Sequence, residues 1–428
     1  MTLTPYQQTV YELSERLVKA QQPIRVLDAI KWDNGIKEEF FKAKGKKLPL
    51  VDTTYYQKHS LPFDPNNKKE EFYTLERDVR RLLGQFSAVG NIMQRMCREY
   101  RELIRMLEAR GLPEFSKISQ ELYGSAEDAF YAGAPRLRDL ATLISNALAN
   151  LKDQVNTPAD IKCYNSEQAV NILSERLNNY FGGSKQQIRV KLSDDIIADA
   201  AAGADIIKLR TEATFSEREL RVIEVHEGWV HIGTTLNGMA QPICTFLSKG
   251  PPSSTITQEG LAILMEIFTF ASYPDRVQRL TNRVTAISMA EQGANFLDIY
   301  KFFCEQGLNE EDSYAHASRI FRGSTPTGGP FTKDLVYSKG FVLIYNYVRL
   351  AIQRGLISRI PLLFAGKTTL EDQRTLADLV AEGLVVAPQY VPPQFVDIAA
   401  LSAWMSYSLF LNRLSLERIA VDYKDILN

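Results

Sequence analysis

Residues 216–262 read SERELRVIEVHEGWVHIGTTLNGMAQPICTFLSKGPPSSTITQEGLA, and they contain two of the four histidines in a chain of 428 residues. His226 and His231 bracket a glutamate, Glu227, in the pattern His-Glu-x-x-x-His. Two imidazoles about one helical turn apart, with a carboxylate directly after the first, let a helix bind zinc and place a base beside the ion. The pattern therefore predicts a zinc site.

The start of this stretch predicts a helix. Ser216 and Glu219 have the spacing of a capping box, in which the serine oxygen accepts from the N3 amide and the glutamate reaches back to the cap amide. The helix would begin near residue 217 and reach the histidines inside the fold. It would do so through an apolar run that includes Leu220, Val222, Ile223 and Val225.

The spacing of the two histidines requires a distorted helix. In a regular α-helix, residues five apart lie about 140° apart around the axis, so His226 and His231 would not share one ion. A π-bulge absorbs one extra residue and returns both side chains to one face, and such bulges concentrate at functional sites. Gly228 adds the backbone freedom that this distortion uses. We therefore expect a bulge near Gly228.

Two histidines leave a zinc site short of one protein ligand if water is to hold the fourth position. Glu259, in the segment TITQEGLA, is the best downstream candidate. Thr257 would cap the next helix and place Glu259 in its first turn, and Gly260 would let another backbone come close. Glu227 would then be the general base that takes a proton from the zinc-bound water.

Charge and composition limit the partners. Lys and Arg number 50 and Asp and Glu number 51, so no net basic field attracts nucleic acid or an anionic membrane. No run approaches the roughly 18 apolar residues that a membrane helix needs, and the N-terminus has no signal-peptide pattern. The four cysteines form no C-x-x-C pair, which is typical of reduced thiols. We therefore expect a cytoplasmic protein without a nucleic-acid or membrane partner, and the sequence leaves its oligomeric state open.

Helical periodicity dominates the rest of the chain. Amphipathic patterns cover residues 4–20, 70–108, 137–155, 166–180, 258–273, 277–291, 294–306, 334–353, 369–382 and 397–419. Gly84 and Gly90 are the points at which the second of these helices would bend or break. Short alternating runs at 188–192 and 206–209 predict a small sheet beside the histidine helix.

These patterns favour a predominantly α-helical α+β fold with a zincin-like metallopeptidase core and a small sheet beside the histidine helix. Residues 1–182 would form a helical region packed on the core, and residues 183–390 the catalytic core. Residues 391–428 would form a C-terminal helical segment. The turn-forming sequence FGGSKQ at 181–186 places the first of these boundaries.

The motifs HEGWVH, TQEGLA and, at 331–340, FTKDLVYSKG together resemble the QEGLA-motif family, from about residue 187 to 387. Its bacterial members carry the label flavohaemoglobin expression-modulating proteins, and it is similar to the microtubule-associated tyrosine carboxypeptidases. The resemblance implies one zinc ion per chain, bound by His226, His231 and Glu259, with Glu227 catalytic. It also implies hydrolysis of the last peptide bond of a peptide or protein, releasing an aromatic residue such as tyrosine. The Gly-Trp-Val inside the motif differs from the eukaryotic trio, so the resemblance does not carry tubulin specificity to this chain.

A carboxypeptidase must also neutralise the terminal carboxylate of its substrate and stabilise an oxyanion. Arg319, Arg322 and Lys333 flank the glycine-rich loop at 323–331 and are the candidates for the carboxylate. Tyr337, four residues after Lys333, is the candidate donor to the oxyanion. His316 we interpret as structural.

Two alternatives stay open at this point. One is a metallopeptidase of amino- or endo-specificity. The other is a non-catalytic regulatory or binding protein whose metal site is structural or vestigial. An intact Glu227 argues against the second, because a purely structural site has no use for a base beside its ligand.

Overall fold

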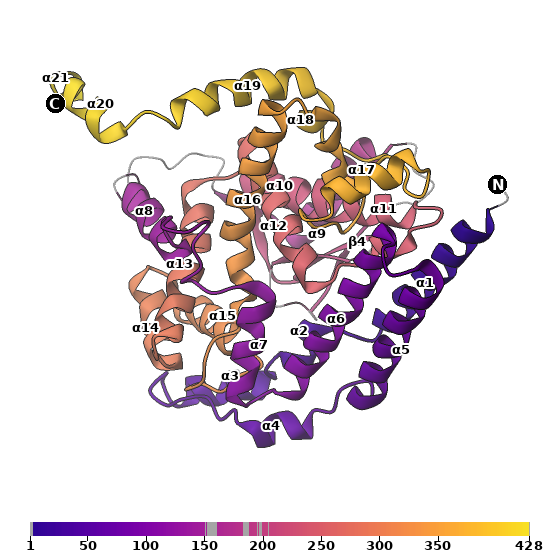
Figure 1. The fold of residues 1–428 in the computed structure, drawn as a ribbon. Coiled ribbons are helices and arrows are strands. Elements are labelled where there is room, and N and C mark those ends of the chain that lie inside the picture. The colour runs from indigo at the N-terminus through magenta and orange to yellow at the C-terminus, as the bar shows by residue number, and fades with distance from the viewer. Residues whose placement is uncertain are drawn as a thin grey trace.

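The computed structural model describes residues 3–149, 151, 161–182, 188–194, 196, 199–203 and 205–427. The chain is mostly helical, with two small sheets, which confirms the predicted predominance of helix in an α+β fold (Figure 1). Within those residues, no helix combines the length and apolar character that crossing a membrane requires.

The N-terminal helices pack as a layer on one side of the molecule (Figure 1). The predicted single helix at 70–108 is wrong, because the chain turns at Gly84, which has a φ of 87°, and forms two packed helices. The Ser87 hydroxyl accepts from the Gly90 amide and starts the second helix, so Gly90 lies inside its first turn. The helices of this layer are α1 (Pro5–Gln21), α5 (Pro65–Leu83), α6 (Ala88–Glu108) and α7 (Pro113–Tyr123).

Five further helices precede the histidine helix in the described residues. They are α2 (Val26–Ile30), α3 (Asn34–Lys42), α4 (Thr53–Lys58), α8 (Leu137–Ala149) and α9 (Ser166–Tyr180). The last residues of the helix predicted at 137–155, and most of the boundary segment at 181–186, lie outside the described residues.

Two small sheets precede the histidine helix. One pairs β1 (Lys162–Asn165) with β5 (Thr214–Ser216) in antiparallel fashion. The other has the order β2-β4-β3, in which β2 (Arg189–Leu192) is parallel and β3 (Ala200–Ala202) antiparallel to β4 (Ile206–Leu209). The two predicted strands are therefore confirmed. The sequence missed β3, since three alanines show no alternation of polar and apolar residues.

Three long helices and the histidine helix form the central core. The chain runs from α10 (Glu217–Ile223) through the π-helix η2 (Glu224–Ile232) into α11 (Gly233–Met239). α12 (Pro252–Phe268) packs against both η2 and α16 (Val336–Gln353), and α13 (Pro274–Glu291) lies alongside (Figure 1). The apolar cluster shared by η2, α12 and α16 includes Trp229, Val230, Leu261, Leu264, Met265, Ile344 and Val348.

The remaining helices surround this core. They are α14 (Phe296–Glu305), α15 (Glu310–Phe321), α17 (Gln373–Ala381), α18 (Pro393–Val396), α19 (Ile398–Leu411), α20 (Leu416–Asp422) and α21 (Lys424–Leu427), with the 3₁₀ turns η3 (Thr245–Ser248), η4 (Thr332–Leu335), η5 (Ile357–Arg359) and η6 (Pro361–Phe364). The helix predicted at 397–419 is two helices, because α19 ends at Leu411 and the Ser415 hydroxyl caps α20. Figure 1 shows α19 to α21 along one edge of the molecule.

The crossing of α12 and α16 depends on two glycines, as the sequence predicted for Gly260. A Cβ on Gly260 would lie 2.3 Å from the carbonyl carbon of Gly340, and a Cβ on Gly340 would lie 2.1 Å from the carbonyl oxygen of Ile256. No real Cβ tolerates such contacts with backbone atoms, so the two helices approach this closely only without side chains there.

Gly260→Ala should lower the free energy of unfolding by about 1–3 kcal/mol or more, because the methyl group forces the two backbones apart. The measurement is chemical denaturation. Gly233→Ala is the matched control, because its Cβ would meet nothing closer than 3.8 Å and it also lies in a helix. Equal stability of both variants would mean that the crossing relaxes without cost.

Candidate metal centre

The histidine helix begins and widens as its sequence predicted. The Ser216 hydroxyl accepts from the Glu219 amide at 3.1 Å, and the Ser216 amide donates to the Glu219 carboxylate at 2.9 Å, which completes the capping box. The π-helix then covers Glu224–Ile232, centred on Gly228. Gly228 has a second role, since a Cβ there would lie 2.3 Å from the Leu177 side chain on α9.

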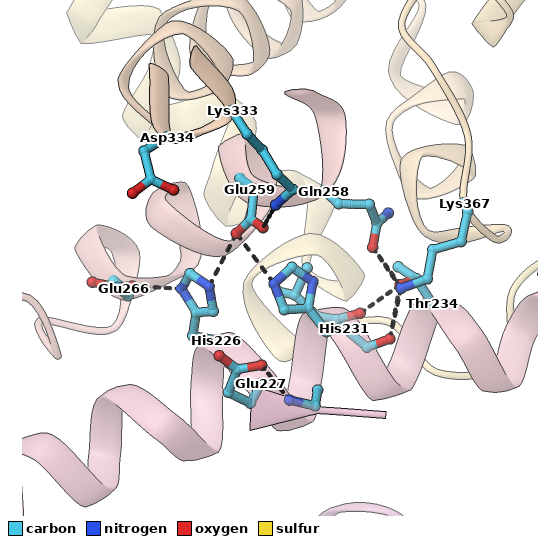
Figure 2. A network of polar contacts seen from close by, with 12 residues as sticks. His226, Glu227, His231, Thr234, Gln258, Glu259, Glu266, Lys333, Asp334 and Lys367 are labelled. Atoms are coloured by element: carbon cyan, nitrogen blue, oxygen red, sulfur yellow. Dashed lines mark hydrogen bonds and ion pairs between the residues drawn. The ribbon is translucent and has the colours of Figure 1, made fainter. Parts of the chain in front are cut away.

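The widened turn brings the two imidazoles together. The ring centroids of His226 and His231 lie 4.9 Å apart, and the Nε2 atom of each lies 3.3 Å from the same oxygen, Oε2 of Glu259 (Figure 2). One ligand atom from each of the three residues lies within 4.8 Å of the other two. The structure thus gathers the three residues that the sequence predicted as metal ligands.

The placement of Glu259 differs from the prediction. Thr257 does not cap the helix; α12 begins at Pro252, and Thr257 is buried inside it. Proline at the first helical position has its φ preset and no amide that needs a partner, so Pro252 starts the helix earlier. Glu259 therefore lies two turns into α12, where the helix is rigid, and not in a first turn that frays.

The three side chains fit a metal ion. Oε2 of Glu259 is buried and makes no hydrogen bond to any described residue, although buried polar atoms normally have a partner. Two imidazole nitrogens and one carboxylate oxygen are the ligands of catalytic zinc sites that keep one position open. Among the described residues, no histidine, cysteine or carboxylate joins the group as a fourth ligand.

The electrostatics also favour a cation at this point. Burial alone would lower the pKa of His226, but the carboxylates of Glu259 and Glu266 beside its ring outweigh burial and raise it to about 10. Burial alone would raise the pKa of Glu259, but the two imidazoles and Lys333 hold it well below its usual range. Carboxylates that stabilise an imidazolium this strongly would equally stabilise a divalent ion.

Glu266 is a partner of the site that the sequence analysis missed. Its Oε1 lies 2.6 Å from Nδ1 of His226, and Arg276 of α13 binds the same carboxylate at 2.9 Å. A proton on Nδ1 leaves Nε2 free to bind a metal, which is the usual arrangement around metal-binding histidines. The sequence could have identified Glu266, because it follows Glu259 by seven residues and so lies on the same face of the helix.

Glu266→Gln should weaken the binding of a divalent metal ion, tested with zinc, about 10- to 100-fold, since it removes the charge that orients the candidate ligand His226. Competition with a chromogenic chelator measures this affinity. Glu305→Gln, an exposed position on α14, is the control and should leave the affinity unchanged. Equal affinities for both variants would show that Glu266 does not support the ligand.

Glu227 lies beside the sheet edge. Its Oε2 accepts from the amide of Ala202 in β3 at 3.0 Å, so the small sheet lies beside the histidine helix, as predicted (Figure 2). The carboxylate is not one of the three gathered ligands. It lines a cavity of about 720 Å³, and His226 lines the same cavity. Glu227 is thus next to the ligand group, on the side that a small molecule can enter.

The other predicted residues fall in two places. Nζ of Lys333 lies 3.9 Å from Oε1 of Glu259, so this lysine is a neighbour of the ligand group. The ring of Tyr337 stacks on His226 with centroids 6.2 Å apart, and burial raises the pKa of its phenol, which keeps the hydroxyl protonated. Arg319 and Arg322 line the cavity instead.

Helix α13 supplies cavity residues that the sequence analysis did not identify. Arg276, Arg279 and Arg283 all line the cavity together with Arg319 and Arg322. Their spacing of three and four residues places them on one helix face, which was the available signal. His316 also lines the cavity, and burial together with Arg283 and Arg319 lowers its pKa to about 3.

Lys367 contacts the C-terminal end of the π-helix. Its Nζ donates to the carbonyl oxygen of His231, to the Thr234 hydroxyl and to Gln258, at 2.9, 3.0 and 2.9 Å (Figure 2). Burial lowers the pKa of Lys367 to about 7. The lysine joins the end of η2 to α12, and it lies 136 residues from His231 in sequence, so no local pattern reveals it.

Comparison with known proteins agrees with this geometry. The family model described as microtubule-associated tyrosine carboxypeptidase matches residues 38–413, which is most of the chain. No curated protein matches this chain. The family match implies a peptidase of the carboxypeptidase type, and it spans every residue of the site. The chain therefore belongs to the microtubule-associated tyrosine carboxypeptidase family.

Proposed function

We propose that this protein is a zinc-dependent carboxypeptidase with a zincin-like core, which removes the C-terminal residue of a peptide or protein. The observation that carries the proposal is the group formed by His226, His231 and Glu259, with Glu227 beside it at the wall of a cavity. Arginines line that same cavity, as suits a substrate that ends in a carboxylate.

Three neighbouring side chains would fix the positions of the ligand residues. Glu266 fixes the His226 ring, Lys333 approaches Glu259, and Lys367 holds the backbone of His231. When bound, zinc supplies Lewis-acid chemistry, since it acidifies water and polarises a carbonyl group. The same ligands accept other divalent ions, and we propose zinc because two imidazoles and one carboxylate are a usual ligand set of catalytic zinc sites.

Glu227 and Tyr337 would carry the proton and charge chemistry. The Glu227 carboxylate accepts the proton of the attacking water and passes it to the leaving amine. The Ala202 amide keeps that carboxylate in place. The Tyr337 hydroxyl, which stays protonated, donates to the oxyanion that develops on the scissile carbonyl.

The edge strand β3 would hold the substrate backbone. β3 pairs with β4 on one side only within the described sheet, and it contacts η2. An extended peptide adds to such an edge through main-chain hydrogen bonds. The terminal side chain would enter the cavity, whose aromatic wall includes Trp32, Phe215 and Tyr273 and suits an aromatic residue such as tyrosine.

A pair of peptides tests this function. The zinc-loaded protein should shorten a tyrosine-terminated peptide by one residue, as seen by mass spectrometry, and should process the C-terminally amidated peptide at least about tenfold more slowly, because a charged hydrogen-bonding partner is lost. Equal cleavage of both peptides, or cleavage at internal bonds, would contradict a carboxypeptidase and favour an amino- or endopeptidase.

A further inference from the structure

Three largely buried arginines, Arg283, Arg319 and Arg322, lie near a single carboxylate, that of Asp334. Arg319 takes both oxygens of Asp334, at 2.9 and 3.0 Å. Nε of Arg283 is only within 3.9 Å of the same carboxylate. Arg322 makes no hydrogen bond or ion pair to any part of the chain that the structure describes. Two guanidinium groups therefore lack a full anionic partner.

Burial makes this imbalance costly. Arg322 is 6% exposed, the side chain of Arg283 is 11% exposed, and the Nε atom of each is buried without a hydrogen bond. Buried cations are normally paired, because removing a charge from water carries a large penalty. Burial and the neighbouring Arg319 lower the pKa of both guanidinium groups to about 10, so both stay charged at neutral pH.

Aromatic rings hold both groups in place. The guanidinium carbon of Arg283 lies 5.6 Å from the centre of the Tyr337 ring, and that of Arg322 lies 5.3 Å from the Phe331 ring. A guanidinium packed by its face on a ring keeps the N–H groups at its edge for hydrogen bonds. Tyr337 in turn stacks on His226, so Arg283 is one ring away from a metal ligand.

We propose that Arg283 and Arg322 form the receptor for the α-carboxylate of the substrate's last residue. This inference rests on the proposed carboxypeptidase function and names the residues that restrict it to chain ends. The terminal carboxylate supplies the anion that the two arginines lack, and its carbon lies two covalent bonds, about 2.5 Å, from the nitrogen of the scissile bond. Arg319, already paired with Asp334, is a positioning residue.

Stability gives a first test, independent of any substrate. Arg322→Met keeps the length of the side chain but removes an unpaired buried charge, so it should raise the Tm. Arg319→Met, three residues earlier on α15, is the matched control; it deprives Asp334 of its partner and should lower the Tm. A lower Tm for Arg322→Met as well would mean that Arg322 is a structural residue and would overturn the proposal.

Binding of a small probe gives the second test. The probe is N-acetylphenylalanine, titrated by calorimetry into zinc-loaded Glu227→Gln protein, and N-acetylphenylalaninamide is its neutral counterpart. Adding Arg283→Met or Arg322→Met should weaken binding of the acid about 10- to 100-fold, as expected for a charged hydrogen-bonding partner, and leave the amide unchanged. N-acetylglutamic acid α-amide separates a side-chain carboxylate from an α-carboxylate and should bind no better than the neutral amide. Unchanged binding of the acid in both variants would overturn the receptor.

The receptor and the proposed function fail in different ways. If the wild-type protein releases terminal residues, but both arginine variants keep its preference for free over amidated peptides, the receptor is wrong and the function stands. If the wild-type protein releases no terminal residue, while its binding of N-acetylphenylalanine still depends on both arginines, the proposed function is wrong and the anion site stands.

Discussion

Glu227→Gln should lower kcat for release of a C-terminal residue about 10²- to 10⁴-fold, the usual contribution of a general base. The amide cannot accept the proton of the attacking water, but it is isosteric and its oxygen can still accept from the Ala202 amide. Glu227 is also outside the group of ligand atoms. The variant and the wild-type protein should therefore both bind one zinc ion per chain and fold with the same stability.

The measurements are steady-state kinetics and metal analysis by mass spectrometry. Glu217→Gln, at a partly exposed position on the same helix, is the matched control and should keep full activity, since its ion pair with Arg176 is near the surface and contributes little. Unchanged activity in Glu227→Gln would remove the base from the mechanism. This result would favour the alternative hypothesis, a regulatory or binding protein with a structural metal site.

His231→Ala should abolish both zinc binding and activity. A structural zinc site is worth about 10–16 kcal/mol over four ligands, so the loss of one ligand weakens binding by about 10²- to 10³-fold or more. His226 and Glu259 would remain, but two protein ligands do not hold zinc against a competing chelator. After treatment with a chelator, added zinc should restore activity to the wild-type protein and not to His231→Ala.

Two other histidines provide controls for this result. His316→Ala alters the same cavity outside the ligand group, and His59→Ala alters an exposed position. Both should keep one zinc ion per chain. Stoichiometric zinc in His231→Ala, at the affinity of the wild-type protein, would show that the metal binds elsewhere.

The histidine helix was predictable because its constraints are local. Ser216 and Glu219 cap it through backbone groups three residues apart, and two ligands five residues apart can share an ion only on a widened turn. The start of α12 was mispredicted because two local signals competed. Thr257 is a good cap, but Pro252 comes first and needs no cap of its own.

The roles of the arginines could not be read from sequence. Arg319 and Arg322 are both within 15 residues of Asp334 in sequence. Nothing in this order shows that Arg319, and not Arg322, donates to both carboxylate oxygens of Asp334. Arg283 belongs to another helix altogether, and only the packing of α13 against η4 and α16 brings it to the same carboxylate. Charge balance in a buried site is a property of the tertiary structure.

The ligand group itself is tested most directly by anomalous diffraction at the zinc absorption edge from crystals of the zinc-loaded protein. We expect one peak per chain at about 2.0–2.2 Å from Nε2 of His226, Nε2 of His231 and the Glu259 carboxylate, with Glu227 not bound to it. A π-helix at Glu224–Ile232 with no peak beside it, or a peak closed by a fourth protein ligand, would contradict a catalytic metal centre.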